Sequence, residues 1–585
     1  MCGVTGVITH SLTSHRLQQG IQESCSFLRS RGPDQTGNFV QTPAAFGVCR
    51  LAIRDPLKGQ QPMEREGYVI TFNGELYQTE ELKNKILAHG WTLETESDTE
   101  LLLLGFITFG PSIFGALSGM FACSIWDIKK EVLYLARDPF GEKPLYYTQG
   151  KTQGEDFFAF ASEIKAFSAW PFMNWDLCVS DLHLFLTHSY LPGLATGWET
   201  IQKLPTGCYL IYKEGRYEKV AYHTHNVSEE IDDHPITSKH LLSLLEESVK
   251  SCCISDKLVG AFFSGGIDST TVSALLSKYV RGAPLFSLHW DHPGYSEEFY
   301  TKLAASALGL NHFSTTCSAA FIMEHFTKLV SLYDEPFADE SMIPTYCLSL
   351  FAKEHVDVVL TGDGADELFH GYERYGFTGD LAEYLNTFCA MPSDVHARIC
   401  EPDFLALKSL SSTKFTVPPI GELSSHRHRS YLDLLHYLPY DILMKVDRAS
   451  MGASLETRAP FLTPNVANFA LKCSSSALKQ DSSSGKKILR SAVKDIIPPL
   501  ILNRKKMGFG VPLKDWFCSS LKSWMMTRLL EGELYQMGWF SREGVLNLIQ
   551  SHLNGEKNHA RALFNLLVLE EWIRNRPQGK NALLL

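Results

Sequence analysis

The stretch Ala-Phe-Phe-Ser-Gly-Gly-Ile-Asp-Ser at residues 261–269 places the strongest constraint on how this chain can fold. A short apolar run over residues 258–263 predicts a buried strand, and apolar residues recur at helical spacing from 270 to 280. Between them, the glycines predict a tight turn that opens onto a helix N-terminus. Uncovered backbone N–H groups and the helix dipole at such a turn favour a bound phosphate or pyrophosphate. A Ser/Gly turn with an N-cap and no ligand is the alternative.

A second glycine-rich segment, Thr-Gly-Asp-Gly-Ala-Asp-Glu at residues 361–367, favours the phosphate interpretation. It follows an apolar run over 356–360, and a further strand is predicted over 284–290 with a helix opening near residue 296. Alternating strands and helices predict a doubly wound parallel sheet, whose ligands bind at the carboxyl ends of the strands. The acidic residues of the two segments would then meet at that edge, in a position to share a magnesium ion with pyrophosphate.

The N-terminal end of the chain carries a cysteine at position 2, followed by a glycine. Removal of Met1 would leave a thiol and a free α-amine on Cys2, and an α-amine titrates low enough to act as a base near neutral pH. A cysteine without a role is the alternative. The segments that follow read Arg-Gly-Pro-Asp at 31–34, Cys-Arg-Leu-Ala-Ile at 49–53, Phe-Asn-Gly-Glu-Leu-Tyr at 72–77 and Glu-Ser-Asp-Thr-Glu at 96–100.

In order and spacing, these segments resemble the class II glutamine amidotransferases, which are N-terminal-nucleophile glutaminases. The resemblance continues through residues 137–147 and 161–165. It implies an N-terminal-nucleophile α/β/β/α sandwich, and alternating apolar stretches at 68–72, 121–127 and 132–136 predict strands that such a sandwich requires. Two positions depart from the family pattern: Gln78 stands where asparagine is usual, and Cys49 where histidine is frequent.

This resemblance implies the chemistry of a glutaminase site. Cys2 is expected to be the nucleophile, and Asn73 with the N–H of Gly74 to form the oxyanion hole. Attack on an amide creates a tetrahedral oxyanion, which donors fixed in place stabilise most. Arg50 and Asp98 are expected to hold the α-carboxylate and the α-amine of glutamine. The full set of expected glutamine-binding residues is Arg50, Leu51, Ala52, Ile53, Asn73, Gly74, Glu75 and Asp98.

The second half of the chain resembles the asparagine synthetase family, whose ATP-pyrophosphatase domain carries both glycine-rich motifs. Further matches lie at residues 334–339, 445–451, 454–462, 486–490 and 505–512. The resemblance implies that a substrate carboxylate attacks the α-phosphorus of ATP, that pyrophosphate leaves, and that ammonia released from glutamine then displaces AMP. The expected cofactors are ATP and Mg2+.

The same resemblance implies roles for individual side chains. Asp363 is expected to act in forming the acyl-adenylate, and Lys486 to neutralise phosphate charge as the bond breaks. A lysine in such a Ser/Lys-rich stretch is otherwise expected to be solvated. Asp268 and Asp366 are the expected metal ligands. The expected ATP-binding residues are Phe263, Ser264, Gly265, Gly266, Asp268, Ser269, Leu288, Thr361 and Gly362.

We therefore expect a two-domain α/β protein. A glutaminase domain is expected over residues 1–215, a polar linker over 216–240, and a synthetase domain over 241–585 that ends in a helical cap. The expected reaction amidates L-aspartate to L-asparagine through β-aspartyl-AMP and releases AMP and pyrophosphate. An amidotransferase of the same family that acts on another carboxylate, such as a cell-wall precursor or a secondary metabolite, is the alternative. A silent scaffold is disfavoured because Cys2, Asp268 and Asp366 are all present.

The acceptor side departs most from the family pattern. Leu-His-Trp at 288–290 replaces the more usual Ile-Gly-Phe, His370 stands where Gly or Ala is common, and Thr463 replaces an Asp. Packing is favoured for Trp290, and a role for His370 stays open. The run His-Arg-His-Arg at 426–429 predicts a solvated loop, with a phosphate-binding role as the alternative.

Composition excludes several classes of protein. The net charge of −11, without a basic stripe, argues against general nucleic-acid binding. The longest apolar run, at 101–109, is shorter than the about 20 residues that span a bilayer, and the N-terminus lacks a secretory signal. The 14 cysteines include no Cys-x-x-Cys pair. We expect a cytoplasmic enzyme whose partners are small molecules, with neither nucleic acid nor membrane, and a homodimer stays open.

Overall fold

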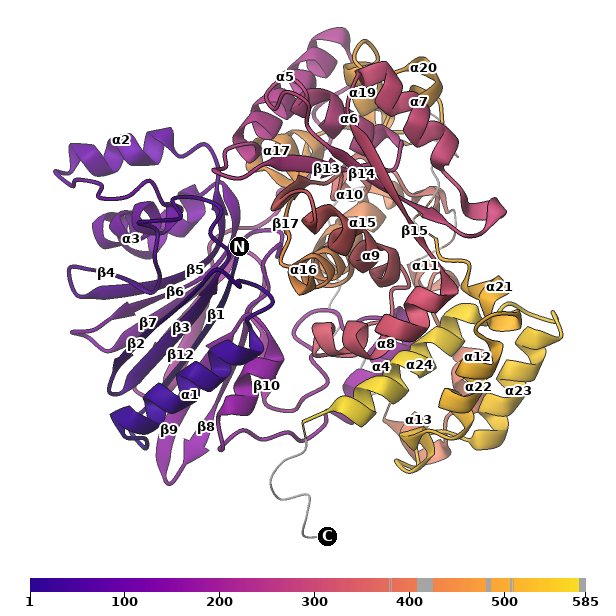
Figure 1. Cartoon of the computed structure of the whole chain (residues 1–585), viewed down its shortest axis with the longest axis horizontal. Coiled ribbons are helices and arrows are strands. Elements are labelled where there is room, and N and C mark those ends of the chain that lie inside the picture. The colour runs from indigo at the N-terminus through magenta and orange to yellow at the C-terminus, as the bar shows by residue number, and fades with distance from the viewer. Residues whose placement is uncertain are drawn as a thin grey trace.

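The computed structural model describes residues 1–377, 379, 381–407, 424–479, 485–504, 508 and 510–577. Figure 1 shows two α/β bodies side by side: an N-terminal pair of antiparallel sheets and a second half built around a parallel sheet. This arrangement confirms the predicted fold class. Residues 505–507 and 509 of the 505–512 motif, which include both of its lysines, lie outside the described residues.

The first sheet of the N-terminal half has the order β10-β8-β9-β1-β3-β2, and all its pairings are antiparallel. The second sheet has the order β12-β11-β7-β6-β5-β4. The strands of the first sheet are β1 (Cys2–Thr9), β2 (Gln35–Gln41), β3 (Ala44–Arg50), β8 (Tyr146–Thr152), β9 (Glu155–Ala161) and β10 (Ile201–Lys203). Those of the second are β4 (Met63–Arg65), β5 (Tyr68–Leu76), β6 (Gly119–Asp127), β7 (Val132–Arg137), β11 (Cys208–Lys213) and β12 (Arg216–Ala221).

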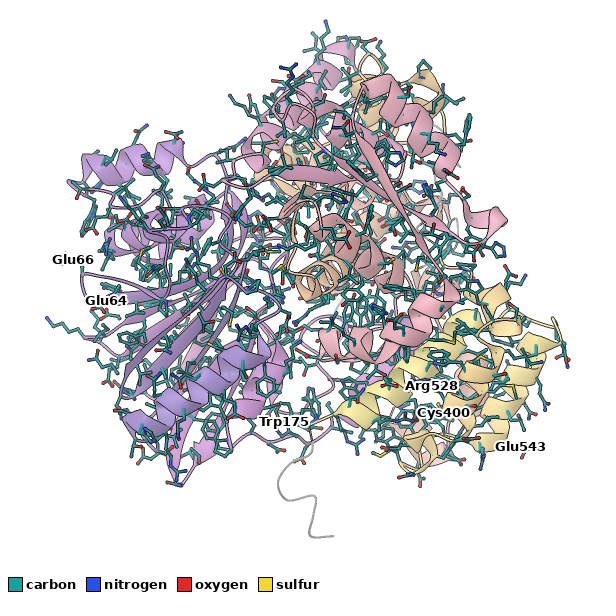
Figure 2. All side chains as sticks on the ribbon, in the orientation of Figure 1. Glu64, Glu66, Trp175, Cys400, Arg528 and Glu543 are labelled. Atoms are coloured by element: carbon teal, nitrogen blue, oxygen red, sulfur yellow. The ribbon has the colours of Figure 1, made fainter. Side chains whose placement is uncertain are left out.

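The two sheets pack face to face through one apolar layer. Phe46, Phe158 and Phe160 of the first sheet meet Trp126 and Leu135 of the second in one buried cluster. Helix α1 (Ser14–Phe27) covers the outer face of the first sheet, while α2 (Glu80–Ala88) and α3 (Asp98–Phe109) lie on the side of the second (Figure 1). The result is the α/β/β/α sandwich expected from the resemblance. Glu64 and Glu66 mark its outer edge in Figure 2.

One helical stretch among the described residues, Asp98–Ala116, is long and apolar enough by composition to be a candidate membrane span. Its residues Leu102, Leu103 and Phe106 pack instead against β5 and β6 in a buried cluster of the sandwich. A core helix of a folded domain passes the same test, and this packing is what such a helix requires.

The sheet of the second half is parallel throughout, with the order β15-β14-β13-β16-β17. Its strands are β13 (Val259–Phe262), β14 (Leu285–Trp290), β15 (His312–Cys317), β16 (Val358–Leu360) and β17 (Glu456–Arg458). Alternate residues point to opposite faces: Leu285 and Val358 join one buried core, while Phe286 and Val359 join another. The strands predicted near 258–263, 284–290 and 356–360 are therefore present, and helices bury both faces.

The helices of one core are α5 (Pro235–Cys252), α6 (Ile267–Leu276), α10 (Ala365–Phe369), α17 (Pro464–Leu471) and α19 (Lys487–Val493). Those that contribute to the other are α8 (Ala319–Tyr333), α9 (Met342–Lys353) and α16 (Leu443–Gly452). Helix α7 (Glu298–Leu308) leads from β14 to β15. The remaining helices are α4 (Val179–His188), α11 (Leu381–Thr387), α12 (Ser393–Ile399), α13 (Pro402–Ala406), α15 (Ser425–Leu432), α18 (Ser475–Leu478), α20 (Pro499–Leu502), α21 (Leu513–Cys518), α22 (Lys522–Leu530), α23 (Arg542–Leu553) and α24 (Ala560–Asn575). The last four form the expected helical cap (Figure 1).

Two sequence expectations need adjustment. Strand β12 pairs with β11, so the expected boundary at residue 215 falls inside a hairpin, and α5 begins inside the expected linker 216–240. The side chains of β12 are mostly exposed, which made the strand resemble a linker. The prediction of a solvated loop at 426–429 is wrong: these residues lie in α15, and Arg427 and Arg429 are buried. Both arginines donate to backbone carbonyls, which is how buried guanidinium groups are satisfied.

Candidate active sites

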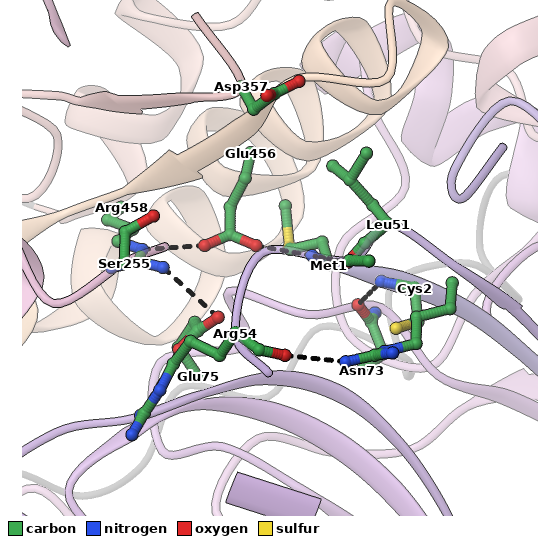
Figure 3. Close-up of polar contacts among 12 residues, drawn as sticks. Met1, Cys2, Leu51, Arg54, Asn73, Glu75, Ser255, Asp357, Glu456 and Arg458 are labelled. Carbon is green, nitrogen blue, oxygen red and sulfur yellow. Dashed lines mark hydrogen bonds and ion pairs between the residues drawn. The ribbon is translucent and has the colours of Figure 1, made fainter. Parts of the chain in front are cut away.

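The first candidate site surrounds Cys2, a buried residue that opens β1 and lies opposite Arg50 in the sheet register. The backbone N–H of Cys2 donates to Oδ1 of Asn73 at 2.8 Å (Figure 3). Because an N–H can only donate, this bond fixes the carbonyl end of the Asn73 amide toward Cys2. The other end, Nδ2, is buried and has no hydrogen-bond partner within the described part of the chain. A free amide donor beside a thiol is suited to an oxyanion.

Gly74 follows Asn73 in β5, at a point where no side chain fits. A Cβ atom there would lie 2.0 Å from the carbonyl oxygen of Met120. Glycine therefore keeps the backbone close to the neighbouring strand and next to the Asn73 amide. The two residues expected to form the oxyanion hole thus lie next to each other in β5, close to Cys2.

The other expected glutamine-binding residues surround the same strand ends. Arg50 donates to Oε1 of Gln35 at 2.7 Å and to the carbonyl of Arg54 at 2.6 Å. The N–H of Leu51 donates to the Met1 carbonyl and that of Ala52 to Oδ2 of Asp34, both at 2.8 Å. These bonds fix the backbone that leads into Ile53. Asp98 opens α3, and its Oδ2 accepts from the N–H of Leu76 at 2.8 Å. Glu75 and Asp98 both contact the guanidinium of Arg54, a residue that the sequence reasoning did not single out.

The protonation of Cys2 depends on its burial. Burial raises the pKa of the Cys2 thiol, although the N-terminal amine and Arg50 act in the opposite direction. A base is therefore needed to take the thiol proton before attack. With Met1 in place, the Cys2 nitrogen is a peptide N–H, and the amine of Met1 pairs with Oε2 of Glu456 at 2.5 Å (Figure 3). The α-amine of Cys2 becomes available as that base only after Met1 is removed.

The second candidate site opens where β13 gives way to α6. Oγ of Ser264 lies 3.1 Å from Oγ of Ser269, which closes the predicted turn into the helix. Gly265 has φ +66°, and a Cβ atom there would lie 2.9 Å from the Thr301 nitrogen, so only glycine suits the turn. Phe263 donates its N–H to the carbonyl of Phe286 at 2.7 Å and so anchors the loop to β14.

A cavity of about 670 Å³ lies against this loop and against the 361–367 segment. The carboxyl ends of β13 and β16 both face it, as the parallel-sheet argument predicted. Gly265 is the one expected ATP-binding residue outside its lining. The expected residues that line it are Phe263, Ser264, Gly266, Asp268, Ser269, Leu288, Thr361, Gly362, Asp363, Asp366 and Lys486.

Lys486 is buried at the centre of this cavity wall. Its Nζ lies 2.5 Å from Oδ2 of Asp268 and 2.5 Å from Oδ1 of Asp366. Burial lowers the pKa of Lys486, but the two carboxylates outweigh it and the pKa ends above its usual value. Two aspartates that converge on one cationic nitrogen also converge closely enough to share a divalent ion. Among the described residues, no group of three or more His, Cys, Asp or Glu is placed to hold a metal. A divalent ion at this place would therefore take its remaining oxygen ligands from outside these side chains.

Asp363 faces the same cavity. Burial raises the pKa of Asp363, with Lys445 acting against that shift and Asp366 adding to it. Arg504, which was quoted in no motif, donates to the carbonyls of Ser264 and Gly265 at 3.2 and 3.0 Å and so braces the loop. The signal that could have found it was its place directly before the 505–512 motif.

Most of the residues that depart from the family pattern near the expected acceptor substrate pack against other side chains. Trp290 meets Trp516 edge-on with ring centroids 5.6 Å apart. Nε2 of His370 lies 2.9 Å from Oγ of Ser430, and burial lowers the pKa of His370 well below its usual value. Thr463 lies 3.0 Å from Oγ of Ser248. These contacts give His370 a structural place in the core.

A buried set of ion pairs joins the two halves. Each pair takes one residue from the N-terminal half and one from the second half, and most belong to motifs that the sequence marked without a role. The pairs are Arg31–Asp447 (2.7 and 3.0 Å), Arg448–Glu163 (2.9 Å), Lys203–Glu335 (2.6 Å) and Arg458–Glu75 (3.2 Å). Figure 3 shows Arg458 between Glu456 and Glu75. The two halves therefore meet at a charged interface whose paired side chains are buried.

Comparison with known proteins matches both halves of the chain. The asparagine synthase family model matches residues 240–574, and the glutamine amidotransferase domain model matches residues 1–223. Asparagine synthetase [glutamine-hydrolyzing] 1 of Bacillus subtilis is 31% identical over 98% of this chain and 96% of its own length. A putative asparagine synthetase [glutamine-hydrolyzing] of Mycobacterium tuberculosis is 29% identical over 94% of this chain and 93% of its own. Among solved structures, a glutamine phosphoribosylpyrophosphate amidotransferase from B. subtilis covers 48% of this chain and 65% of its own, with 17% identity and a TM-score of 0.29.

Proposed function

Because this chain belongs to the glutamine-hydrolysing asparagine synthetase family, we propose that it transfers the amide nitrogen of glutamine to L-aspartate, with ATP as the source of energy. Membership makes the chain an enzyme of this ligase type. The observation that carries the finer proposal is the convergence of Lys486, Asp268 and Asp366 in one cavity. A further part of the proposal is that the enzyme works in the cytoplasm on small molecules.

In the N-terminal half, the proposed reaction begins with Cys2. The thiolate attacks the amide carbon of glutamine, and the thiol proton passes to the α-amine of the processed chain. Nδ2 of Asn73 donates to the oxyanion that forms, and ammonia leaves with the transferred proton. Water then hydrolyses the thioester to glutamate. The free Nδ2 and the close backbone at Gly74 support this assignment.

In the second half, an oxygen of the β-carboxylate of aspartate attacks the α-phosphorus of ATP, and the bond to pyrophosphate breaks. Lys486 neutralises charge that develops on the phosphates, while the leaving pyrophosphate lies against the Ser264–Gly266 turn at the N-terminus of α6. Ammonia attacks the acyl carbon of β-aspartyl-AMP, and AMP leaves as the nitrogen loses a proton. Asp268 and Asp366 would hold Mg2+, which would offset the negative charge of the phosphates.

The proposal of aspartate as acceptor has its own support. The cavity wall includes the cationic side chains of Lys445, Arg490 and Arg504 and the anionic side chains of Asp339 and Glu367. A small zwitterion that carries an ammonium and a second carboxylate needs both signs of charge around it. The experiment below distinguishes aspartate from the alternative, which is another carboxylate acceptor.

The test measures pyrophosphate release with ATP, Mg2+ and glutamine, with and without L-aspartate, and identifies the amidated product by mass. We expect release that depends on aspartate, and asparagine as the product. Glutamine hydrolysis without aspartate-dependent release would contradict aspartate as the acceptor and favour another carboxylate. A parallel reaction of the Cys2→Ala enzyme with ammonium chloride is expected to form asparagine without glutamine.

A further inference from the structure

Asp98 is expected to hold the α-ammonium group of glutamine, but both of its carboxylate oxygens already contact another group of the protein. Oδ2 of Asp98 accepts the N–H of Leu76 at 2.8 Å, and Oδ1 is buried against the guanidinium of Arg54. The Asp98 side chain is only 5% exposed. An ammonium group that approaches Asp98 therefore meets Arg54 first.

Arg54 neutralises a second acid of the site as well. Its Nη1 lies 3.7 Å from Oε2 of Glu75, whose other oxygen lies 3.2 Å from Arg458. Both acidic residues of the expected glutamine set are thus paired with arginines before any substrate arrives. A guanidinium and an ammonium carry the same charge, so they compete for one carboxylate.

The side chain of Arg54 is partly exposed, while its backbone is held on both flanks. The Arg54 side chain is 21% exposed, so it lies nearer the solvent than Asp98 does. On one flank, the carbonyl of Ile53 accepts the N–H of Asp256 at 3.1 Å, and on the other, the N–H of Asp55 donates to Oδ2 of Asp256 at 2.8 Å. Asp256 belongs to the second half of the chain, just before β13. A displacement of Arg54 is therefore a side-chain movement about a fixed backbone.

We propose that Arg54 determines the affinity of this enzyme for glutamine, because its guanidinium occupies the ammonium-binding oxygen of Asp98 and must leave before glutamine binds. This inference rests on the proposed glutaminase function of the Cys2 site. It makes Arg54 a competitor of the substrate within the free enzyme. Removal of its charge is therefore expected to tighten glutamine binding, which is the opposite of what loss of a substrate-binding group would do.

The experiment measures L-glutamine binding by calorimetry in the Cys2→Ala enzyme, which binds without turnover. Arg54→Leu is expected to lower the dissociation constant about fivefold, as loss of a partly exposed competing ion pair allows. Arg54→Gln also removes the charge while retaining a hydrogen-bonding side chain, and is expected to act in the same direction. If Arg54→Leu does not fold, Arg54→Gln serves as the test instead. In the enzyme with Cys2 intact, both variants are expected to lower KM for glutamine with kcat unchanged.

Arg65→Leu is the matched control. Arg65 pairs with Glu94 and Glu100 in the same half of the chain and is 27% exposed, but it contacts none of the expected glutamine-binding residues. It is expected to leave the dissociation constant unchanged. Weaker or equal binding in Arg54→Leu and Arg54→Gln would overturn the proposal for Arg54. Failure of the intact enzyme to hydrolyse glutamine would instead overturn the proposed function, so the two failures are distinguishable.

Discussion

Nζ of Lys486 lies 2.5 Å from Oδ2 of Asp268, although the two residues are 218 positions apart in the chain. The pair brings the end of one glycine-rich motif into contact with a lysine from a Ser/Lys-rich stretch. A buried lysine between two carboxylates stays charged and holds them close to each other. In the proposed reaction, this cation exchanges its carboxylate partners for the phosphates of ATP.

Substitution of Lys486 tests this role directly. Lys486→Met is expected to reduce aspartate-dependent pyrophosphate release at least about 100-fold, because loss of one fixed electrostatic donor typically costs that factor. Glutamine hydrolysis in the other half is expected to persist. Lys487→Met is the matched control, because this neighbouring lysine is 38% exposed and pairs with Asp233. Equal losses in both variants would contradict a specific role for Lys486.

Substitution of Cys2 is expected to separate glutamine-dependent synthesis from ammonia-dependent synthesis. Cys2→Ala is expected to abolish glutamine-dependent synthesis while ammonium chloride still supports it. Because burial raises the pKa of the Cys2 thiol, alkylation of the native enzyme by iodoacetamide is expected to accelerate as the pH rises above the usual thiol range. Cys518, which is exposed, is the control position. Retention of glutamine-dependent synthesis in Cys2→Ala, or its loss in Cys518→Ala, would contradict Cys2 as the nucleophile.

The residues predicted from sequence were those tied to backbone geometry. Gly265 stands where a Cβ atom would collide with backbone, and its glycine-rich turn leaves a readable pattern in the chain, whereas Gly74 was singled out only through the resemblance. The apolar run at 356–360 likewise predicted β16, since both faces of that strand pack into buried cores. Lys486 was found only through the resemblance, because its local sequence is that of a solvated loop.

Long-range ion pairs leave no such local signal. Arg54 and Asp98 are 44 positions apart by number, and nothing in either segment shows that the guanidinium covers the carboxylate. Arg427 and Arg429 were predicted to be solvated because charge suggests exposure, yet both satisfy backbone carbonyls inside the protein. Strand β12 was missed because most of its side chains are exposed and polar, so its sequence shows no clear alternation of apolar and polar residues.

The interface between the halves depends on Asp447. Asp447→Ala is expected to destabilise the protein by about 3–5 kcal/mol, because it leaves the buried Arg31 without its bidentate partner. The measurement is the denaturation midpoint in urea, followed by tryptophan fluorescence. Asp394→Ala is the control, since Asp394 pairs with Arg398 on the surface at 2.8 Å and its loss is expected to shift the midpoint little. Similar shifts for both variants would contradict a structural role for the interface network.

Glu142 lies at the same interface, in a small cavity that it shares with Asp363. Burial, and then Asp138, raise the pKa of Glu142 from 4.5 to about 8. Between these values the folded protein holds a proton that the unfolded chain has lost, so stability falls as the pH rises through this window and levels off above it.

Glu142→Gln resembles the protonated side chain and removes this dependence. We therefore expect the thermal midpoint of the wild-type enzyme to fall relative to that of Glu142→Gln between pH 5.5 and 8.5, by an amount that corresponds to about 3 kcal/mol. Glu543→Gln is the control, because Glu543 lies exposed on α23 (Figure 2) and its replacement is expected to leave the wild-type pH dependence unchanged. Parallel pH curves for the wild type and Glu142→Gln would show that Glu142 is ionised in the folded protein at neutral pH, and the buried carboxyl would then need a cation beside it.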